Sequence, residues 1–236
     1  MYNPAMTRYA FMLLFLTTIL SAQSEVEITA EPDHHLVLTN NQVRVFYVDV
    51  APHAETLMHW HRHDYVFVTL GETQVVNAVK GKGPVTLTLH DGDTGLLPAP
   101  FAHIARNTSD KPFRNLTIEL LQDEKLRHSS FKWDEDRGLH ILHGGTEEIL
   151  WVKDGVRASL FELQPGGMVP LHHHQGPHLL VAVSDVDLSN VAGKESMSGM
   201  PGHFKSGDCK WLPGNYSHSI TNTGTKPAKF VTLEFP

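Results

Sequence analysis

The sequence predicts an all-β fold arranged as two tandem barrel-like domains. Short runs rich in Val, Thr, Leu and Phe alternate with turn signals such as Asn40-Asn41, Asp91-Gly92 and Asp154-Gly155. Helical periodicity is nearly absent after Ser24. Several short strands in each half of the chain favour a sandwich or a barrel over other architectures.

An internal repeat divides the chain into two copies. The first part of the repeat recurs at an offset of 113, and comprises Val43, Pro52, His59 and His61, matched by Val156, Pro165, His172 and His174. The second part recurs at an offset of 115, and comprises Gly92, Pro98, His103 and Asn107, matched by Gly207, Pro213, His218 and Asn222. The charged stretch 122–145 is the natural connection. We therefore expect domains at 25–121 and 146–236.

The N-terminal segment 1–24 is typical of an export signal. Arg8 precedes an apolar run from Tyr9 to Leu20, and small residues follow, so that cleavage is expected after Ala22 or Ser24. A single-pass anchor is the alternative, but this run of about 12 residues is shorter than the roughly 20 needed to span a bilayer. The sequence thus predicts a secreted or periplasmic protein with no membrane anchor after signal cleavage.

The net charge limits the classes of binding partner, and the cysteine count limits the possible disulfides. The formal net charge is -7 and the pI is near 6.2, so the chain has no basic field to gather phosphates, and nucleic acid is excluded as an expected partner. A small molecule or a metal remains. Cys209 is the single cysteine, which rules out an intrachain disulfide and predicts a buried, inert thiol.

Sheet-on-sheet packing between two copies of the chain is compatible with a homodimer.

Each copy carries three histidines in a pattern suited to metal. His59 and His61 are two residues apart, as are His172 and His174, and side chains at this spacing share one face of a strand. A third histidine, His103 or His218, follows five residues after a proline. One HxH pair alone indicates little in a chain with 17 histidines, but three inward imidazoles suit a metal with open positions.

These spacings resemble the two motifs of the cupin superfamily. The first motif is matched by Gly166, followed after five residues by His172 and then His174. The second motif is matched by Gly207, Pro213, His218 and Asn222. The 43–121 copy keeps the same histidines, proline and asparagine. The resemblance spans nearly all of 43–236 and implies two tandem cupin barrels, that is, double-stranded β-helix or jelly-roll domains, with a divalent transition metal such as Fe, Mn, Ni, Cu or Zn.

The family's glutamate ligand is missing from both copies. Tyr65 and His178 stand in its place. His178 has the parity of the HxH pair, so the predicted second metal site consists of His172, His174, His178 and His218. The predicted first site consists of His59, His61 and His103. Tyr65 and His63 are its auxiliary candidates, although a neutral phenol is a poor ligand. An all-imidazole shell leaves the metal charge uncompensated and favours an anionic ligand.

The other residues of the motifs have structural interpretations. Glycines 92 and 207 are expected in turns, and Asn107 and Asn222 in turn hydrogen bonds. Pro100 and Asn215 replace a family glycine. Trp60 and His173 are expected on the opposite strand face. Solvent-facing positions are expected for the histidines without patterned partners, which are His34, His35, His90, His140 and His203.

Three functions are compatible with these features. The first is a metal-dependent enzyme, either a dioxygenase-like cupin or a related lyase or isomerase, acting on a small molecule. Cupin oxalate decarboxylases and germin-like oxalate oxidases are disfavoured by the missing glutamate. The second is a non-catalytic protein that binds or stores a metal or small ligand. In the third, the first barrel is degenerate and mainly packs against the second. A general base in the second barrel would favour an enzyme; the sequence shows no inward carboxylate there.

Overall fold

The computed structural model describes residues 25–192 and 201–236. The predicted signal segment 1–24 lies outside them. The all-β prediction is confirmed: apart from the single-turn η1 (Ile28–Ala30) and the short helix α1 (Asp123–Arg127), the described elements are strands. No described helix has the length and apolar character needed to cross a membrane.

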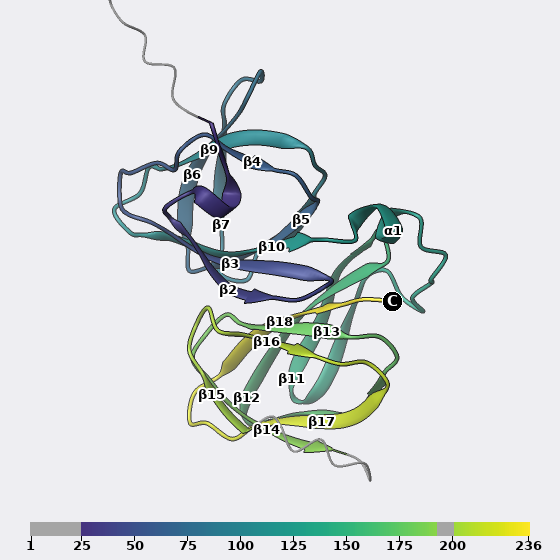
Figure 1. Cartoon of the computed structure of the whole chain (residues 1–236). Coiled ribbons are helices and arrows are strands. Elements are labelled where there is room, and N and C mark those ends of the chain that lie inside the picture. Colours follow the sequence, from purple (N-terminus) through teal and green to yellow (C-terminus); the bar gives the residue numbers. More distant parts are fainter. Residues whose placement is uncertain (1–24, 193–200) are drawn as a thin grey trace, which may run out of the picture.

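The residues before α1 form two five-stranded sheets. One sheet has the order β1 (Val26–Glu27), β4 (His59–His61), β9 (Phe101–Asn107), β6 (Thr73–Val79) and β7 (Val85–Leu89). The other has the order β2 (His34–Thr39), β3 (Val43–Val50), β10 (Phe113–Leu120), β5 (Tyr65–Leu70) and β8 (Thr94–Leu97). These strands form the upper body in Figure 1.

The residues after α1 form a third, eight-stranded sheet. Its order is β15 (Pro201–Phe204), β14 (Val186–Ala192), β17 (Tyr216–Asn222), β12 (Val156–His174), β18 (Ala228–Glu234), β13 (His178–Ala182) and β16 (Cys209–Leu212). The long strand β11 (Gly138–Lys153) pairs with β12. These strands form the lower body in Figure 1. β11 begins at Gly138, so part of the segment expected as a connection is strand.

Strand pairing reproduces the sequence repeat. In the first half, Val48 of β3 pairs with Asn115 of β10. In the second half, Phe161 of β12 pairs with Phe230 of β18, and these two positions are related to Val48 and Asn115 by the two offsets of the repeat. The repeat is therefore present in the hydrogen-bond register as well as in the sequence.

An apolar core joins the two halves. One cluster of buried side chains contains Val45 and Ile118 from the first half together with Ala158 and Leu233 from the second. Because side chains alternate along a strand, the other faces of the same strands form a separate cluster in each half. The sheets of the two halves therefore pack against each other within one chain. The homodimer expected from the sequence stays a prediction.

The repeated turn residues take the roles expected from the sequence. The glycines at 92 and 207 have φ angles of 87° and 92°, a conformation that glycine adopts without strain. Asn107 Nδ2 donates to the carbonyls of Val50, Ala51 and Lys111. Asn222 Nδ2 donates to those of Leu163 and Lys226. These bonds hold the loops after β9 and β17, the strands that carry the third histidine of each copy.

Candidate metal centres

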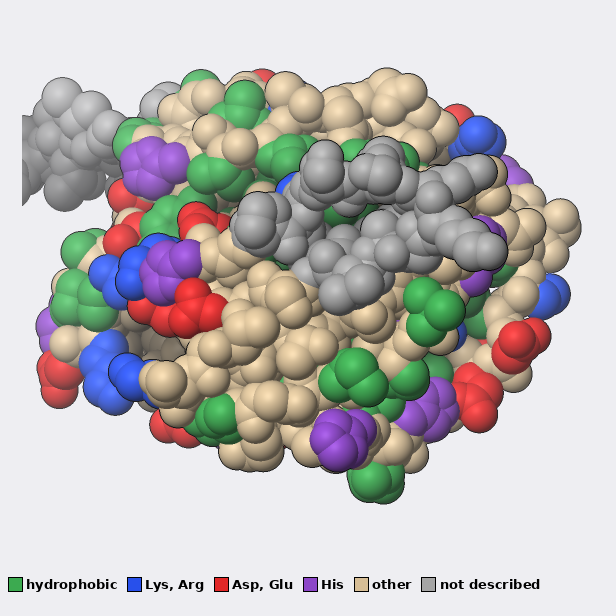
Figure 2. All heavy atoms as spheres, turned by 90° about the horizontal axis from the view of Figure 1, so that it is seen from below, with side chains coloured by type: hydrophobic (Ala, Val, Ile, Leu, Met, Phe, Trp, Pro, Cys, Tyr) green, Lys and Arg blue, Asp and Glu red, His purple; other side chains and the backbone are tan. Residues whose placement is uncertain are grey.

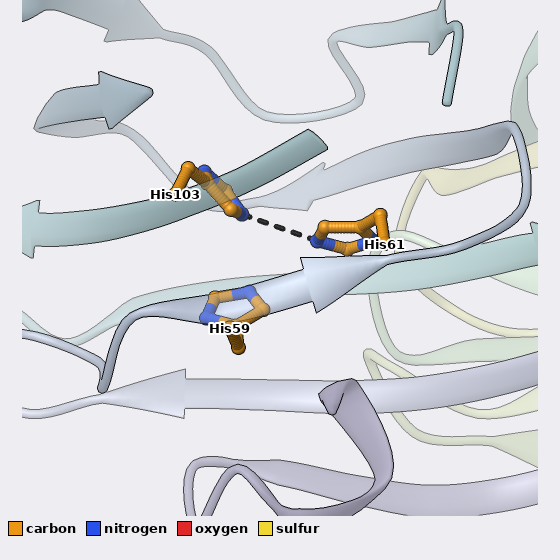
Figure 3. A group of neighbouring side chains, drawn as sticks. All are labelled: His59, His61 and His103. Carbon is orange, nitrogen blue, oxygen red and sulfur yellow. Dashed lines mark hydrogen bonds between the residues drawn. The ribbon is translucent and has the colours of Figure 1, made fainter. Parts of the chain in front are cut away.

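Three histidines converge in the first half, and we call them the first triad. His59 and His61 lie on β4, and His103 lies on the neighbouring strand β9 in register with His59. Their ligand nitrogens all lie within 4.8 Å of one another, and all three side chains are buried. Figure 3 shows the rings turned toward one another, with His61 Nε2 and His103 Nε2 3.1 Å apart.

Hydrogen bonds on the outer side of the first triad fix which nitrogen faces inward. His59 Nδ1 donates to the Leu57 carbonyl at 2.8 Å, and His103 Nδ1 donates to Asn77 Oδ1 at 2.7 Å. Their Nε2 atoms therefore carry lone pairs. His59 Nε2 is buried and has no hydrogen-bond partner among the described residues. Burial lowers the pKa of His59 to about 4, which keeps the ring in its neutral, metal-binding form.

Three histidines converge in the same way in the second half, and we call them the second triad. His172 and His174 end β12, and His218 on β17 pairs in register with His172. Their ligand nitrogens lie within 4.8 Å of one another. His174 Nε2 is 2.8 Å from His172 Nε2 and 3.0 Å from His218 Nε2. Burial lowers the pKa of His218 to about 3.

The outer bonds of the second triad include a buried carboxylate. His172 Nδ1 donates to the Pro170 carbonyl at 2.8 Å. His174 Nδ1 donates to Glu234 Oε1 at 2.7 Å, and Arg157 Nε donates to Glu234 Oε2 at 2.6 Å. Burial alone would raise the pKa of Glu234, but the bond from His174 and the charge of Arg157 lower it to about 2. Glu234 thus remains ionised and holds His174 with Nε2 facing the triad.

Both triads fit a divalent transition metal. Nitrogens bound at right angles to one ion at about 2.1 Å are about 3.0 Å apart, and the triad contacts of 2.8 to 3.1 Å have this spacing. Two lone-pair nitrogens facing each other repel unless a proton or a cation lies between them. A cation satisfies all three rings of a triad at once. Imidazole ligands accept several first-row metals, so the donor set does not select one.

His178 lies beside the second triad and not within it. Its ring stacks on His174 with centroids 3.9 Å apart and an interplanar angle of 19°, and its centroid is 5.9 Å from that of His218. It is not among the three residues whose ligand atoms lie within 4.8 Å of one another. Strand parity placed His178 on the correct face, but its ring covers His174 instead of joining the nitrogens.

Tyr65 has the same position in the first half. Its ring stacks on His61 with centroids 4.1 Å apart at 22°. Burial raises the pKa of the phenol, which therefore stays neutral. The two residues that replace the family glutamate both stack their rings on the second histidine of an HxH pair.

His63 does not join the first triad. β4 ends at His61, and His63 lies in a bend beyond it, where its Nδ1 is 3.5 Å from Asp123 Oδ1. Alternation of side chains applies only while the chain stays extended, so the parity argument fails past the end of the strand.

Two histidines expected to face solvent line the cavities instead. The His34 side chain is 5% exposed, and its ring centroid is 4.6 Å from that of His59. His140, 40% exposed, lines the cavity of the second triad. His35, His90 and His203 are exposed as expected. Figure 2 shows histidine side chains at several places on the surface seen from below.

The two triads open into cavities of different size. The first cavity has a volume of about 80 Å³. Its lining is largely apolar and includes Phe67, Val75, Leu87 and Phe113. The second has a volume of about 320 Å³. Besides the triad, its lining combines the apolar Phe161, Val169, Leu180 and Ile220 with the ionisable His140, Glu147, Arg157 and Glu234. The second cavity is therefore the larger and the more polar.

Sequence reasoning missed the carboxylates around the triads. Glu234 and its counterpart Glu119 end the same Thr-x-Glu pattern in the two copies, so the repeat itself carried the signal. Arg44 Nε donates to Glu119 Oε2 at 2.8 Å. Glu119 Oε1 is buried without a hydrogen-bond partner in the described part of the chain. The second histidine of the HxH pair thus donates a hydrogen bond to this carboxylate in the second half, from His174 to Glu234.

An all-β fold with histidine triads on paired strands agrees with the cupin resemblance of the sequence. Residues 18–121 match the family model described as Cupin. Residues 18–121 therefore resemble a cupin domain, and the all-β fold of the described residues is consistent with a cupin jelly-roll. No curated protein sequence matches the chain.

Solved structures with a similar fold include oxalate decarboxylases. The Lactobacillus farciminis oxalate decarboxylase formate complex has a TM-score of 0.62 and 17% identity, and the match covers 86% of this chain and 84% of that chain. A point mutant of the Bacillus subtilis oxalate decarboxylase has a TM-score of 0.61 and 14% identity, with 86% and 75% covered. A further structure, with the same TM-score, identity and coverage, comes from work on the Mn(II) centres of the Bacillus subtilis enzyme. At these identities the likeness concerns the fold.

Proposed function

We propose that this protein is a secreted or periplasmic two-domain cupin metalloenzyme that acts on a small molecule bound at the second triad. In this proposal residues 1–24 are a cleaved signal, and residues 25–121 and 146–236 are the two domains. The reaction belongs to the dioxygenase-like class or to the related lyases and isomerases. One observation carries the proposal: three imidazoles converge on a cavity of about 320 Å³ that also holds ionisable side chains.

Different residues of the second cavity would bind the metal, orient its ligands and shape the substrate site. His172, His174 and His218 would hold the ion through Nε2, and Glu234 keeps His174 in the tautomer that this requires. A bound divalent ion would supply Lewis acidity or oxygen-activating chemistry. The apolar side chains of Phe161, Leu180 and their neighbours exclude bulk water and shape the substrate.

The ligand set favours an anionic substrate group. The triad supplies no carboxylate ligand, and the buried carboxylate of Glu234 is already engaged by Arg157 and by Nδ1 of His174. A divalent cation held by three neutral rings keeps its charge for an incoming anion or hydroxide. With Tyr65 and His178 in place of a glutamate ligand, oxalate chemistry is not the reaction that we favour.

The first triad supports a second, non-catalytic role. Its cavity of about 80 Å³ is small and largely apolar, and the rings of Tyr65 and Phe101 lie against His61. Such a site has room for an ion and small ligands such as water. We propose that the first domain binds metal for storage or stability, or is a degenerate partner of the second.

Metal analysis of the mature protein, purified without a histidine tag or chelator, tests the proposal. We expect a first-row transition metal, and we expect His174→Ala to lose the ion of the second site while His173→Ala retains it. His173 is the matched control, because it lies between the ligands and its Nδ1 contacts Ser217 Oγ on the exposed side. A wild-type protein that carries no metal, and takes up none when several are offered, would refute the enzyme and leave a metal-free ligand-binding protein.

A further inference from the structure

We propose that Glu147 is the proton-transfer group of the second cavity and that His140 positions it. Both residues lie on β11, the strand that pairs with β12. The inference rests on the proposed function, because it assigns a role beside the metal site of the second triad. It also identifies the kind of ligand that the cavity would take, namely a small acid that binds through oxygen after losing a proton.

Glu147 is placed to meet a ligand of the second triad. Its side chain lines the same cavity as His172, His174 and His218 and is 17% exposed. It is near enough to act on the charge of His172. The oxygens of Glu234 are engaged by Arg157 and His174, whereas Glu147 is bonded through Oε2 to His140. Its other carboxylate oxygen is therefore available to a ligand.

His140 is held between two carboxylates. Its Nδ1 donates to Glu147 Oε2 at 3.3 Å and its Nε2 donates to Glu135 Oε2 at 2.6 Å. A ring that donates from both nitrogens is an imidazolium, and the two bonds raise the pKa of His140. The positive ring fixes the position of the Glu147 carboxylate at the cavity. Among the described residues that line the cavity, the other charged groups are Arg157 and Glu234, which pair with each other.

A bend in β11 makes this contact. Seven residues of extended strand would separate His140 from Glu147 by about 23 Å, yet their side chains touch. The register with β12 breaks between His143 and Gly145, where Gly144 has a φ of 68°. A Cβ on Gly145 would lie 2.2 Å from the Glu162 carbonyl oxygen. The two glycines thus let the chain turn and bring both arms of β11 to one cavity.

The first cavity has an ionisable pair at the equivalent position. Glu147 pairs with Phe161, and His34 pairs with Val48. The first offset of the repeat relates His34 to Glu147 and Val48 to Phe161. His34 lines the first cavity, and its Nδ1 donates to the buried Glu31 at 2.5 Å. The outer strand of each half therefore brings one member of a histidine-carboxylate pair to its cavity, although the residue type at the shared position differs.

The proposed step is a single proton transfer. The O–H bond of the ligand breaks, its electron pair stays on the ligand oxygen, and the proton forms a new O–H bond with Glu147. The triad residues His172, His174 and His218 would hold the divalent ion whose charge favours the resulting anion. Hydroxamic acids, enols and hydroxy acids are of this chemical class. The step needs no oxidant or reductant.

Proton counting by calorimetry tests the assignment. Acetohydroxamic acid is titrated into the zinc-loaded protein in two buffers of different ionisation enthalpy, which gives the protons released to solvent. We expect the wild type to retain the proton and Glu147→Gln to release about one proton for each ligand bound. Glu148→Gln is the matched control, because Glu148 is the exposed neighbour on the same strand; it should behave as the wild type. His140→Gln should release an intermediate amount.

The outcomes separate this inference from the proposed function. If zinc or the hydroxamate fails to bind to the wild type, the metal centre is refuted and the role of Glu147 falls with it. If both bind, and the wild type, Glu147→Gln and Glu148→Gln release the same number of protons, the metal centre stands and the role of Glu147 is refuted. Zinc content and the circular dichroism spectrum show that each variant is folded and loaded.

Discussion

Replacing Glu234 by Gln should weaken metal binding at the second triad, whereas the equivalent change at Glu119 should not weaken the first. Glu234 Oε1 accepts the Nδ1–H of His174 at 2.7 Å, so the carboxylate fixes the tautomer and strengthens Nε2 as a ligand. Glu119 has no such bond, since its Oε1 and His61 Nδ1 are both buried without hydrogen-bond partners among the described residues.

The magnitude follows from the role of an outer carboxylate on a ligating histidine. Loss of such a partner typically costs 10- to 100-fold in metal affinity, which is roughly 1.4 to 2.7 kcal/mol. A glutamine amide can turn its oxygen toward His174, but its NH2 then faces Arg157. Because one contact or the other is lost, we expect an effect near the upper part of this range.

Each site is assayed in a protein that has lost the other. Glu234→Gln is made in the His61→Ala background and Glu119→Gln in the His174→Ala background, and zinc affinity is measured by competition with a chromophoric chelator. We expect a loss of about 10- to 100-fold for the first and less than about threefold for the second. Equal losses at the two sites, or no loss in Glu234→Gln, would refute the link between this carboxylate and the triad.

Three further predictions concern the whole protein. Five histidines of the triads have lowered pKa values, so below pH 6.5 the unfolded metal-free chain binds more protons than the folded chain. The free energy of unfolding, measured with urea, should therefore fall as the pH drops from about 6.5 to about 4. The expected slope is about 2.7 kcal/mol per pH unit if two histidines dominate. Gly145→Ala should destabilise the fold by at least about 2 kcal/mol, since its Cβ would lie 2.2 Å from a carbonyl oxygen, whereas Gly83→Ala, with nothing within 4 Å, should change the denaturation midpoint little. Cys209 is half-buried rather than fully buried as the sequence predicted. Burial raises its pKa to about 12, so a thiol reagent at pH 8 should modify the unfolded protein quickly and the native protein slowly. Fast labelling of the native protein would contradict this raised pKa.

The sequence predicted the fold class and the triads because both depend on local rules. Period-two alternation places His59 and His61, or His172 and His174, on one face of a strand. The turn glycine comes before the preceding strand, and the proline comes just before the strand that carries the third histidine. The repeat then supplied the same pattern twice, which made the pairing of His103 with His59 and of His218 with His172 the natural expectation.

The remaining parts of the site depend on contacts that alternation cannot reveal. His63 was misplaced because β4 ends two residues earlier, at His61. His34 and His140 were assigned to solvent because no patterned partner accompanies them in sequence. Their partners, Glu31 and Glu147, are three and seven residues away in sequence, and the contacts depend on how the chain turns before β2 and within β11.

Metal binding at the inward nitrogens of the second triad is the property on which the proposed function depends. Crystals of the protein grown with manganese or zinc and measured at the absorption edge of that metal would test it most directly. We predict an anomalous difference peak about 2.1 Å from Nε2 of His172, His174 and His218. A fully loaded protein whose peaks lie elsewhere, or at the Nδ1 atoms that contact Pro170 and Glu234, would contradict this assignment.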